Sequence, residues 1–179
     1  MERALVERSL TGDRAAFDDL VRSRIDIVYR TSLAILGDTA DAADATQETF
    51  ISAWRSRGSL RDADRFDAWF GRILVNTCRD RLRHGARRRT QDLSAELALH
   101  GGDPFRQADD RELIGSALAA LSPDHQIVIV LRFYLDLSTR QIAERLGTRE
   151  GTVSSRLHYA LERLRTALDG PTAQEQSHD

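Results

Sequence analysis

The 179-residue sequence contains no lysine and only one cysteine, so all 26 basic residues are arginine and no internal disulfide can form. Cys78 and five scattered histidines show none of the spacings that bind zinc, and no metal or other cofactor is expected. No run of about 18 apolar residues is present, and the start, MERALVERSL, lacks the apolar core of a signal peptide. We therefore expect a cytoplasmic protein without membrane insertion.

The composition limits how this chain could bind nucleic acid. A net charge of −2 excludes an overall basic coat, so any such binding must come from local patches. Arginine offers a planar fork that suits phosphate and guanine, although arginine-favouring codons in a GC-rich genome are the better explanation for the lack of lysine.

Apolar periodicity predicts an all-α fold, with two small helical domains joined by a flexible linker. The expected division is 1–85, linker 86–108, 109–169 and a disordered tail 170–179. In the first domain, the pattern predicts helices at about 13–36, 38–56 and 64–84, ending before Gly37, Gly58 and Gly85.

The second domain contains an ambiguous β-branched run at 127–131. The preceding Ser122-Pro123 is typical of a helix start, and the apolar pattern continues to Leu137. Both features favour a buried helix over a strand.

Residues 138–164 carry the most informative pattern. Ser138 and Gln141 form a candidate capping box, and Gly147 suits the left-handed conformation that ends a helix. An apolar stripe follows, at Val153, Leu157, Ala160, Leu161, Leu164 and Leu168. Polar residues occupy the opposite face and its edges, namely Thr152, Ser155, Arg156, His158, Tyr159, Glu162 and Arg163. This pattern predicts a helix-turn-helix; an ordinary helical hairpin with a solvated face is the alternative.

The helix expected at 64–84 concentrates positive charge on one face. Spacings of seven, four, three and four place Arg65, Arg72, Asn76, Arg79 and Arg83 in one narrow wedge, with Trp69 at its edge. The reverse face is apolar, with Phe66, Phe70, Ile73, Leu74 and Thr77. Charge beside an aromatic side chain suits single-stranded nucleic acid, whereas a solvated face with Trp69 in the core is the plainer interpretation.

The helix expected at 38–56 carries the opposite charge. Asp41, Asp44 and Glu48 share one face, and no basic residue occurs from Leu36 to Trp54. The inward face is expected to contain Ala43, Thr46, Phe50, Ala53 and Trp54. By itself, an acidic face indicates only solubility.

Together, these motifs resemble a bacterial sigma factor of the extracytoplasmic-function type, which has only regions 2 and 4. Residues 41–50, DAADATQETF, are similar to the segment that docks on the polymerase β′ clamp helices. Residues 66–83, FDAWFGRILVNTCRDRLR, resemble the segment that melts and reads the −10 element. QIAERLG at 141–147 and GTVSSRL at 151–157 resemble the −35 helix-turn-helix.

The resemblance implies a set of functional residues. Core polymerase docking would involve Asp41, Asp44, Gln47 and Glu48. The −10 strand would be bound and melted by Arg61, Arg65, Phe66, Trp69, Arg72, Asn76, Arg79, Asp80 and Arg83. The −35 element would be bound by Arg149, Thr152, Val153, Ser154, Ser155, Arg156, His158, Tyr159 and Arg163. Implied partners are core RNA polymerase, through its β′ clamp helices and β flap, promoter DNA and an anti-sigma factor.

Two departures from the family pattern affect the −35 helix. Ser154 stands where the family often has lysine, and His158-Tyr159 replaces a more basic pair. The first departure implies one phosphate contact fewer, and the second leaves the −35 sequence preference open.

The alternative function is a helix-turn-helix transcriptional regulator that binds duplex DNA without being a polymerase subunit. Such a protein would have no use for the Trp69-arginine helix. No enzymatic activity is expected, because Cys78 has no evident catalytic partner and no glycine-rich phosphate loop occurs.

Overall fold

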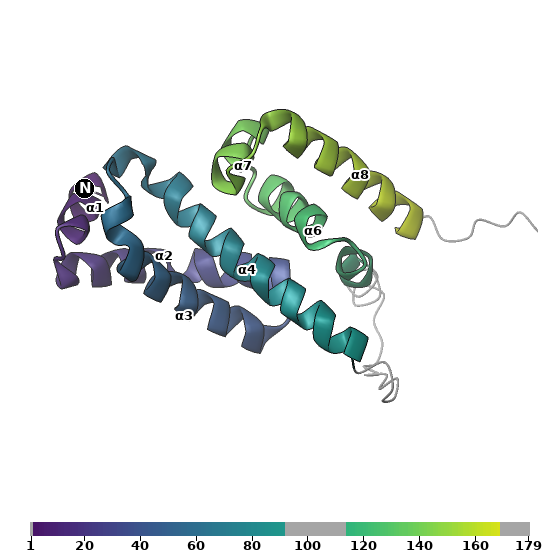
Figure 1. Ribbon diagram of the computed structural model, residues 1–179, viewed down its shortest axis with the longest axis horizontal. Helices are drawn as coiled ribbons and strands as arrows, with labels where there is room; N and C mark the ends of the chain where they lie inside the picture. Colours follow the sequence, from purple (N-terminus) through teal and green to yellow (C-terminus); the bar gives the residue numbers. More distant parts are fainter. Residues whose placement is uncertain (1, 92–113, 169–179) are drawn as a thin grey trace, which may run out of the picture.

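The protein is represented by a computed structural model that describes residues 2–91 and 114–168 (Figure 1). Its first part contains α1 (Glu2–Leu10), α2 (Arg14–Leu36), α3 (Thr39–Ser56), the 3-10 turns η1 (Arg57–Ser59) and η2 (Ala63–Arg65), and α4 (Phe66–Gln91). Its second part contains a helical stretch at 114–119, α6 (Pro123–Ile129), the π-helix η3 (Val130–Tyr134), α7 (Thr139–Leu146) and α8 (Glu150–Leu168). The described residues form no strand, and the all-α prediction is confirmed.

Helices α1 to α4 form an N-terminal bundle. Helices α2, α3 and α4 pack pairwise around a core that includes Leu20, Ile35, Phe50 and Phe70. Helix α1 was not expected from the sequence. It covers α2 and is anchored by Val6, which is buried among the core side chains.

Side-chain caps fix where the predicted helices begin. Asp13 accepts a hydrogen bond from the Ala16 backbone amide, and this bond, with the nearby Arg8, lowers the pKa of Asp13. Asp38 caps α3 in the same way, by accepting from the Asp41 amide. Both starts agree with the sequence prediction.

The end of α4 differs from the prediction. The sequence placed the helix end at Gly85 and the linker from 86, but α4 continues to Gln91. Glycine costs only about 1 kcal/mol inside a helix, and the arginine-rich segment that follows has good helix propensity. The rest of the expected linker, 92–108, and the tail 170–179 lie outside the described residues.

The C-terminal bundle, residues 114–168, is built around a helical hairpin. Ser122 caps α6 and Pro123 occupies its first turn, so the run at 127–131 is helical and buried, as predicted. Helix α6 continues directly into the wider π-helix η3. The capping box of Ser138 and Gln141 opens α7, and Gly147 closes it in the left-handed conformation, with φ of 63°.

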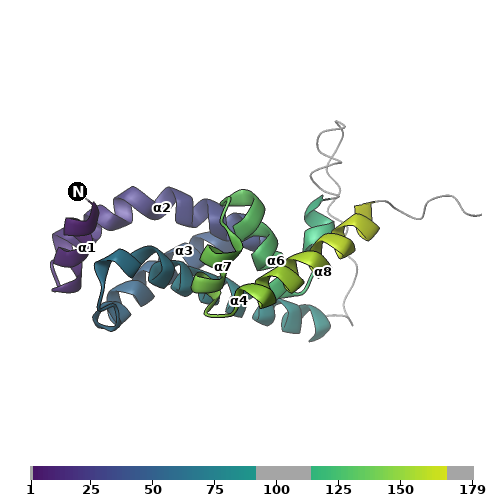
Figure 2. The same cartoon turned by 90° about the horizontal axis from the view of Figure 1, so that it is seen from above.

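The two bundles lie side by side, with α6 and α7 against α4 (Figures 1 and 2). Their buried side chains form one continuous hydrophobic cluster. The buried Gln126 side chain donates to the Ile35 carbonyl at 2.6 Å. Gly71 permits the side chain of Arg145 to approach α4 closely, because a Cβ atom at residue 71 would lie 2.8 Å from Cδ of Arg145.

Burial against α4 has an electrostatic effect on Arg145. Desolvation lowers the pKa of this guanidinium, and the nearby Asp67 carboxylate opposes the shift. Across the described helices, none is both long and apolar enough to cross a membrane.

Candidate functional site

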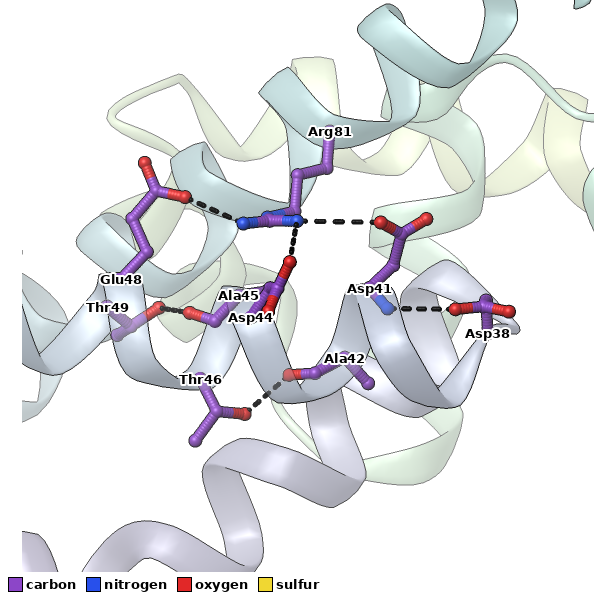
Figure 3. A network of polar contacts seen from close by, with 9 residues as sticks. All are labelled: Asp38, Asp41, Ala42, Asp44, Ala45, Thr46, Glu48, Thr49 and Arg81. Carbon is purple, nitrogen blue, oxygen red and sulfur yellow. Dashed lines mark hydrogen bonds and ion pairs between the residues drawn. The ribbon is translucent and has the colours of Figure 1, made fainter.

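The acidic face of α3 is formed as predicted (Figure 3). The side chains of Asp41, Asp44 and Glu48 are 59%, 66% and 56% exposed, and Gln47 is also exposed. The inward face contains Ala42, Ala45, Thr46, Thr49, Phe50 and Ala53. Ala43, which the sequence assigned to that face, is exposed instead.

An arginine from α4 contacts all three acidic side chains of this face (Figure 3). Nη1 of Arg81 lies 3.5 Å from Asp41 and 3.4 Å from Asp44, and Nη2 lies 3.1 Å from Glu48. Sequence reasoning missed Arg81, because it lies outside the basic wedge of its own helix. Its contacts depend on how α3 and α4 pack, which no local pattern reports.

The basic face of α4 is only partly open to solvent. Arg72, Asn76, Asp80 and Arg83 are exposed, whereas the side chain of Arg79 is 16% exposed. On the reverse face Phe66, Phe70, Leu74 and Thr77 are buried and Ile73 is partly buried, as predicted.

Phe66, which the family resemblance also assigns to the −10 strand, is buried in this structure. Its ring is 6% exposed, packs on Phe70 and Trp69 and has the Arg24 guanidinium over it. Apolar burial therefore gives Phe66 a core role.

Trp69 and the residues before α4 surround an open pocket. The pocket has a volume of about 420 Å³, and its lining includes Ser59, Arg61, Arg65, Trp69 and Arg72. The indole Nε1 of Trp69 donates to Ser59 Oγ at 3.0 Å, which fixes the ring at the pocket wall. The structure thus brings an aromatic ring and three guanidinium groups together.

Helix α8 presents a polar surface, as the helix-turn-helix pattern predicted. The exposed residues are Arg149, Ser154, Ser155, His158, Tyr159 and Arg163, and Thr152 is half-buried. His158 lies 3.6 Å from Glu162, one turn further along. Val153, which the sequence assigned to DNA, is fully buried and belongs to the core. Leu161 and Leu168, assigned to the apolar stripe, are exposed.

One arginine from α4 and one from α8 both contact the carboxylate of Asp124. Asp124 Oδ1 lies 2.9 Å from Nε of Arg79 on α4, and Asp124 Oδ2 lies 3.0 Å from Nη2 of Arg156 on α8. Arg72 also reaches across, donating to the Glu144 carbonyl at 3.0 Å. No local sequence pattern indicates these contacts, because they join residues far apart in the chain.

Comparison with known protein families assigns both bundles. The Sigma-70 region 2 family matches residues 20–88, and the Sigma-70, region 4 family matches residues 117–166. Fold and matches together define a protein with sigma-70 regions 2 and 4 in that order.

Similarity to individual relatives extends over most of the chain. It is 38% identical over 167 residues to "ECF RNA polymerase sigma factor SigL" of Mycobacterium tuberculosis, covering 89% of this chain and 94% of that protein. It is 32% identical over 160 residues to "RNA polymerase sigma-E factor" of Streptomyces antibioticus, covering 88% and 87%. The chain belongs to the ECF RNA polymerase sigma factors.

Solved structures show the same architecture. CnrH, in complex with the cytosolic domain of CnrY, matches with a TM-score of 0.68 and 28% identity, covering 94% of this chain and 97% of that one. The sigma factor RpoE, in complex with the anti-sigma factor NepR from Bartonella quintana, matches with a TM-score of 0.65 over 87% and 98%. At 22% identity, the second match supports the fold alone.

Proposed function

We propose that this protein is a promoter-specificity subunit that binds core RNA polymerase and directs initiation at −35/−10 promoters, melting the −10 region. The observation that carries the proposal is the match of regions 2 and 4, in family order, on one chain. The acidic α3 and the two basic helices supply the three surfaces that this role needs. A regulator that binds duplex DNA alone would leave the acidic face and the Trp69 pocket without a function.

Core polymerase docks on the acidic face of α3 in this proposal. Asp41, Asp44 and Glu48 are exposed along one side of the helix, with Gln47 beside them. Complementary charge across an interface speeds encounter and fixes register more than it raises affinity. The basic partner surface is the β′ clamp helices, and region 4 contacts the β flap.

The −10 strand binds along α4 and the pocket beside Trp69. Arg61, Arg65, Arg72, Asn76, Asp80 and Arg83 are exposed on that surface, and Arg79 joins them when the bundles separate. One unpaired base enters the pocket beside the indole. Extracting a base costs a few kcal/mol, which stacking and phosphate contacts must offset.

The −35 element binds in the major groove along α8. The N-terminal part of a recognition helix lies nearest the bases, and it presents Arg149, Thr152, Ser154 and Ser155 here. Arg156 binds phosphate or guanine once released from Asp124. His158, Tyr159 and Arg163 extend the same exposed surface.

The proposed division of the chain follows these surfaces. Region 2 comprises residues 1–85, region 4 comprises 109–169, and residues 86–108 connect them, with the first six of these still within α4. An anti-sigma factor is a further proposed partner. The support is the similarity to CnrH, whose solved structure contains the cytosolic domain of CnrY.

Run-off transcription with purified bacterial core polymerase and a library of promoter fragments tests the proposal. We expect transcripts that appear only when this chain is added, and their start sites would define the −35 and −10 preferences. Asp44→Arg combined with Glu48→Arg should abolish holoenzyme formation while helicity is retained. Tight binding to duplex DNA without polymerase, and no transcripts, would instead support the regulator.

A further inference from the structure

We infer that Arg81 is a positioning residue for the polymerase-docking face, holding Asp41, Asp44 and Glu48 in the arrangement that core polymerase meets. The inference rests on the proposed docking role of these acids. It adds a residue of α4 to a surface that otherwise belongs to α3 (Figure 3).

Arg81 lies close to three side chains of like charge. Asp41, Asp44 and Glu48 follow one another at spacings of three and four residues, so their carboxylates lie on one face of α3 and repel one another. The side chain of Arg81 is 25% exposed, whereas each acid is more than half exposed. A half-buried cation therefore contacts three carboxylates that are each more exposed than it is.

The geometry of the Arg81 contacts also supports a positioning role. The Arg81 guanidinium forks, with Nη1 against Asp41 and Asp44 and Nη2 against Glu48. These contacts use Oδ1 of Asp41, Oδ2 of Asp44 and Oε2 of Glu48. Among the described residues, no other side chain donates a hydrogen bond to the second oxygen of these carboxylates. One oxygen of each acid contacts Arg81, which leaves the other for a basic partner.

The position of the Arg81 side chain itself also supports a positioning role. Its Nε atom is buried without a hydrogen-bond partner among the described residues. An unpaired buried donor is unfavourable, so the three ion pairs must compensate for it. Arg81 is placed to reach the acids rather than to satisfy all its own donors.

Two opposite effects on polymerase binding follow from this arrangement. Arg81 reduces the negative charge of the face, which slows electrostatically steered association. It also orders three side chains before docking, so less conformational entropy is lost in the complex. We infer that the second effect is larger, and that Arg81 lengthens the lifetime of the holoenzyme.

The test measures association and dissociation rates of the full chain with purified bacterial core polymerase. Arg81→Met keeps the aliphatic stem and removes the charge. It should raise the dissociation rate about tenfold, while the association rate at low salt stays equal or increases. An unfolded variant would not associate faster, so an increased association rate for Arg81→Met would rule out loss of fold as the cause. Arg81→Lys keeps the charge but not the fork, and its dissociation rate should lie between those of wild type and Arg81→Met.

Controls separate this inference from the docking proposal. Arg22→Ala breaks an exposed ion pair with Asp19 on α2 and should leave both rates unchanged. If Asp44→Asn with Glu48→Gln binds core as wild type does, the docking face itself is wrong. If that double variant is weakened but Arg81→Met dissociates as slowly as wild type, only the role of Arg81 is overturned.

Circular dichroism establishes whether each variant is folded. If Arg81→Met does not fold, the inference is tested by the dissociation rate of Arg81→Lys alone. A wild-type dissociation rate for Arg81→Lys would then contradict positioning by the forked guanidinium.

Discussion

At the scale of single residues, Cys78 shows what burial does to an ionisable group. Its thiol is fully buried and donates to Ser32 Oγ at 3.8 Å. Desolvation raises the pKa of Cys78 to about 11, against an ordinary value of 9.0. The native thiol is therefore protonated at neutral pH, and it serves as a small apolar residue in the core.

We predict that the free energy of unfolding falls as pH rises from about 9 to about 11. In that window Cys78 ionises in the unfolded chain but not in the folded one, which favours unfolding. The loss should be on the order of 2 kcal/mol. Urea unfolding across this pH range measures it, and Cys78→Ala, in which other titrations persist, should show a smaller decline.

Val153 and Phe66 illustrate which site residues the sequence could and could not place. Their neighbours in the motifs were assigned correctly to polar surfaces, because helical periodicity separates faces. Both residues were assigned to DNA through family resemblance, although each belongs to the apolar side of its own helix and is buried. Periodicity was the better guide here, since it reflects the burial that the fold requires.

At the scale of elements, caps determined how well helix boundaries could be predicted. Asp13, Asp38, Ser122 and Ser138 all mark helix starts where the sequence placed them. A cap is a local hydrogen bond, so it can be recognised from neighbouring residues alone. Gly85 does not end α4, because a glycine ends a helix only when the chain turns there.

The capping box of α7 leads to a prediction about region 4. Ser138→Ala removes the acceptor for the Gln141 amide, which lies 3.2 Å from Ser138 Oγ. We expect a loss of about 1 kcal/mol in the free energy of unfolding, measured by urea denaturation. Ser154→Ala on the exposed face of α8 is the matched control. Equal stability of the two variants would contradict the role of the cap.

The basic face of α4 leads to a second prediction at this scale. Arg83→Ala should weaken holoenzyme binding to promoter DNA broadly and reduce the salt dependence by about one unit, as for one lost phosphate contact. Arg79→Ala should do the same, and it also removes the ion pair with Asp124. Fluorescence anisotropy at several salt concentrations measures both. An unchanged slope would exclude a phosphate contact.

At the scale of the whole molecule, the closed arrangement competes with promoter binding. Asp124 pairs with Arg79 of α4 across the two bundles and with Arg156 of α8 within the C-terminal bundle, so Arg79 is unavailable to phosphate while the bundles are packed. The acidic face of α3 remains exposed in the same arrangement. On the proposed function, docking on core polymerase can therefore precede separation of the bundles, whereas promoter contact by Arg79 must follow it.

We predict that Asp124→Asn shifts the free chain toward the open form. Loss of the partly buried charge pair between Arg79 and Asp124, which spans the two bundles, should increase the open fraction about tenfold. The expected results are a larger radius of gyration in small-angle X-ray scattering and tighter binding to promoter DNA without polymerase. Asp19→Asn, which breaks an exposed pair with Arg22, is the control. If Asp124→Asn leaves both measurements at wild-type values, the carboxylate does not hold the bundles together.

The packing of the two bundles could not be predicted from the sequence. Their separate folds follow from local periodicity and caps, but the interface depends on isolated contacts such as Gln126 to the Ile35 carbonyl. A single polar pair between residues 91 positions apart leaves no repeating pattern. The same applies to Arg81 and its three acids, which join two helices through side chains alone.

Gly71 gives this arrangement an evolutionary consequence. The stem of Arg145 crosses α4 where residue 71 has no side chain, and a methyl group would already meet it at 2.8 Å. Every glycine codon is a single-base change from codons for alanine and valine. One nucleotide substitution could thus displace the Arg145 side chain from α4 without altering any charge, and so change how closely the two bundles pack.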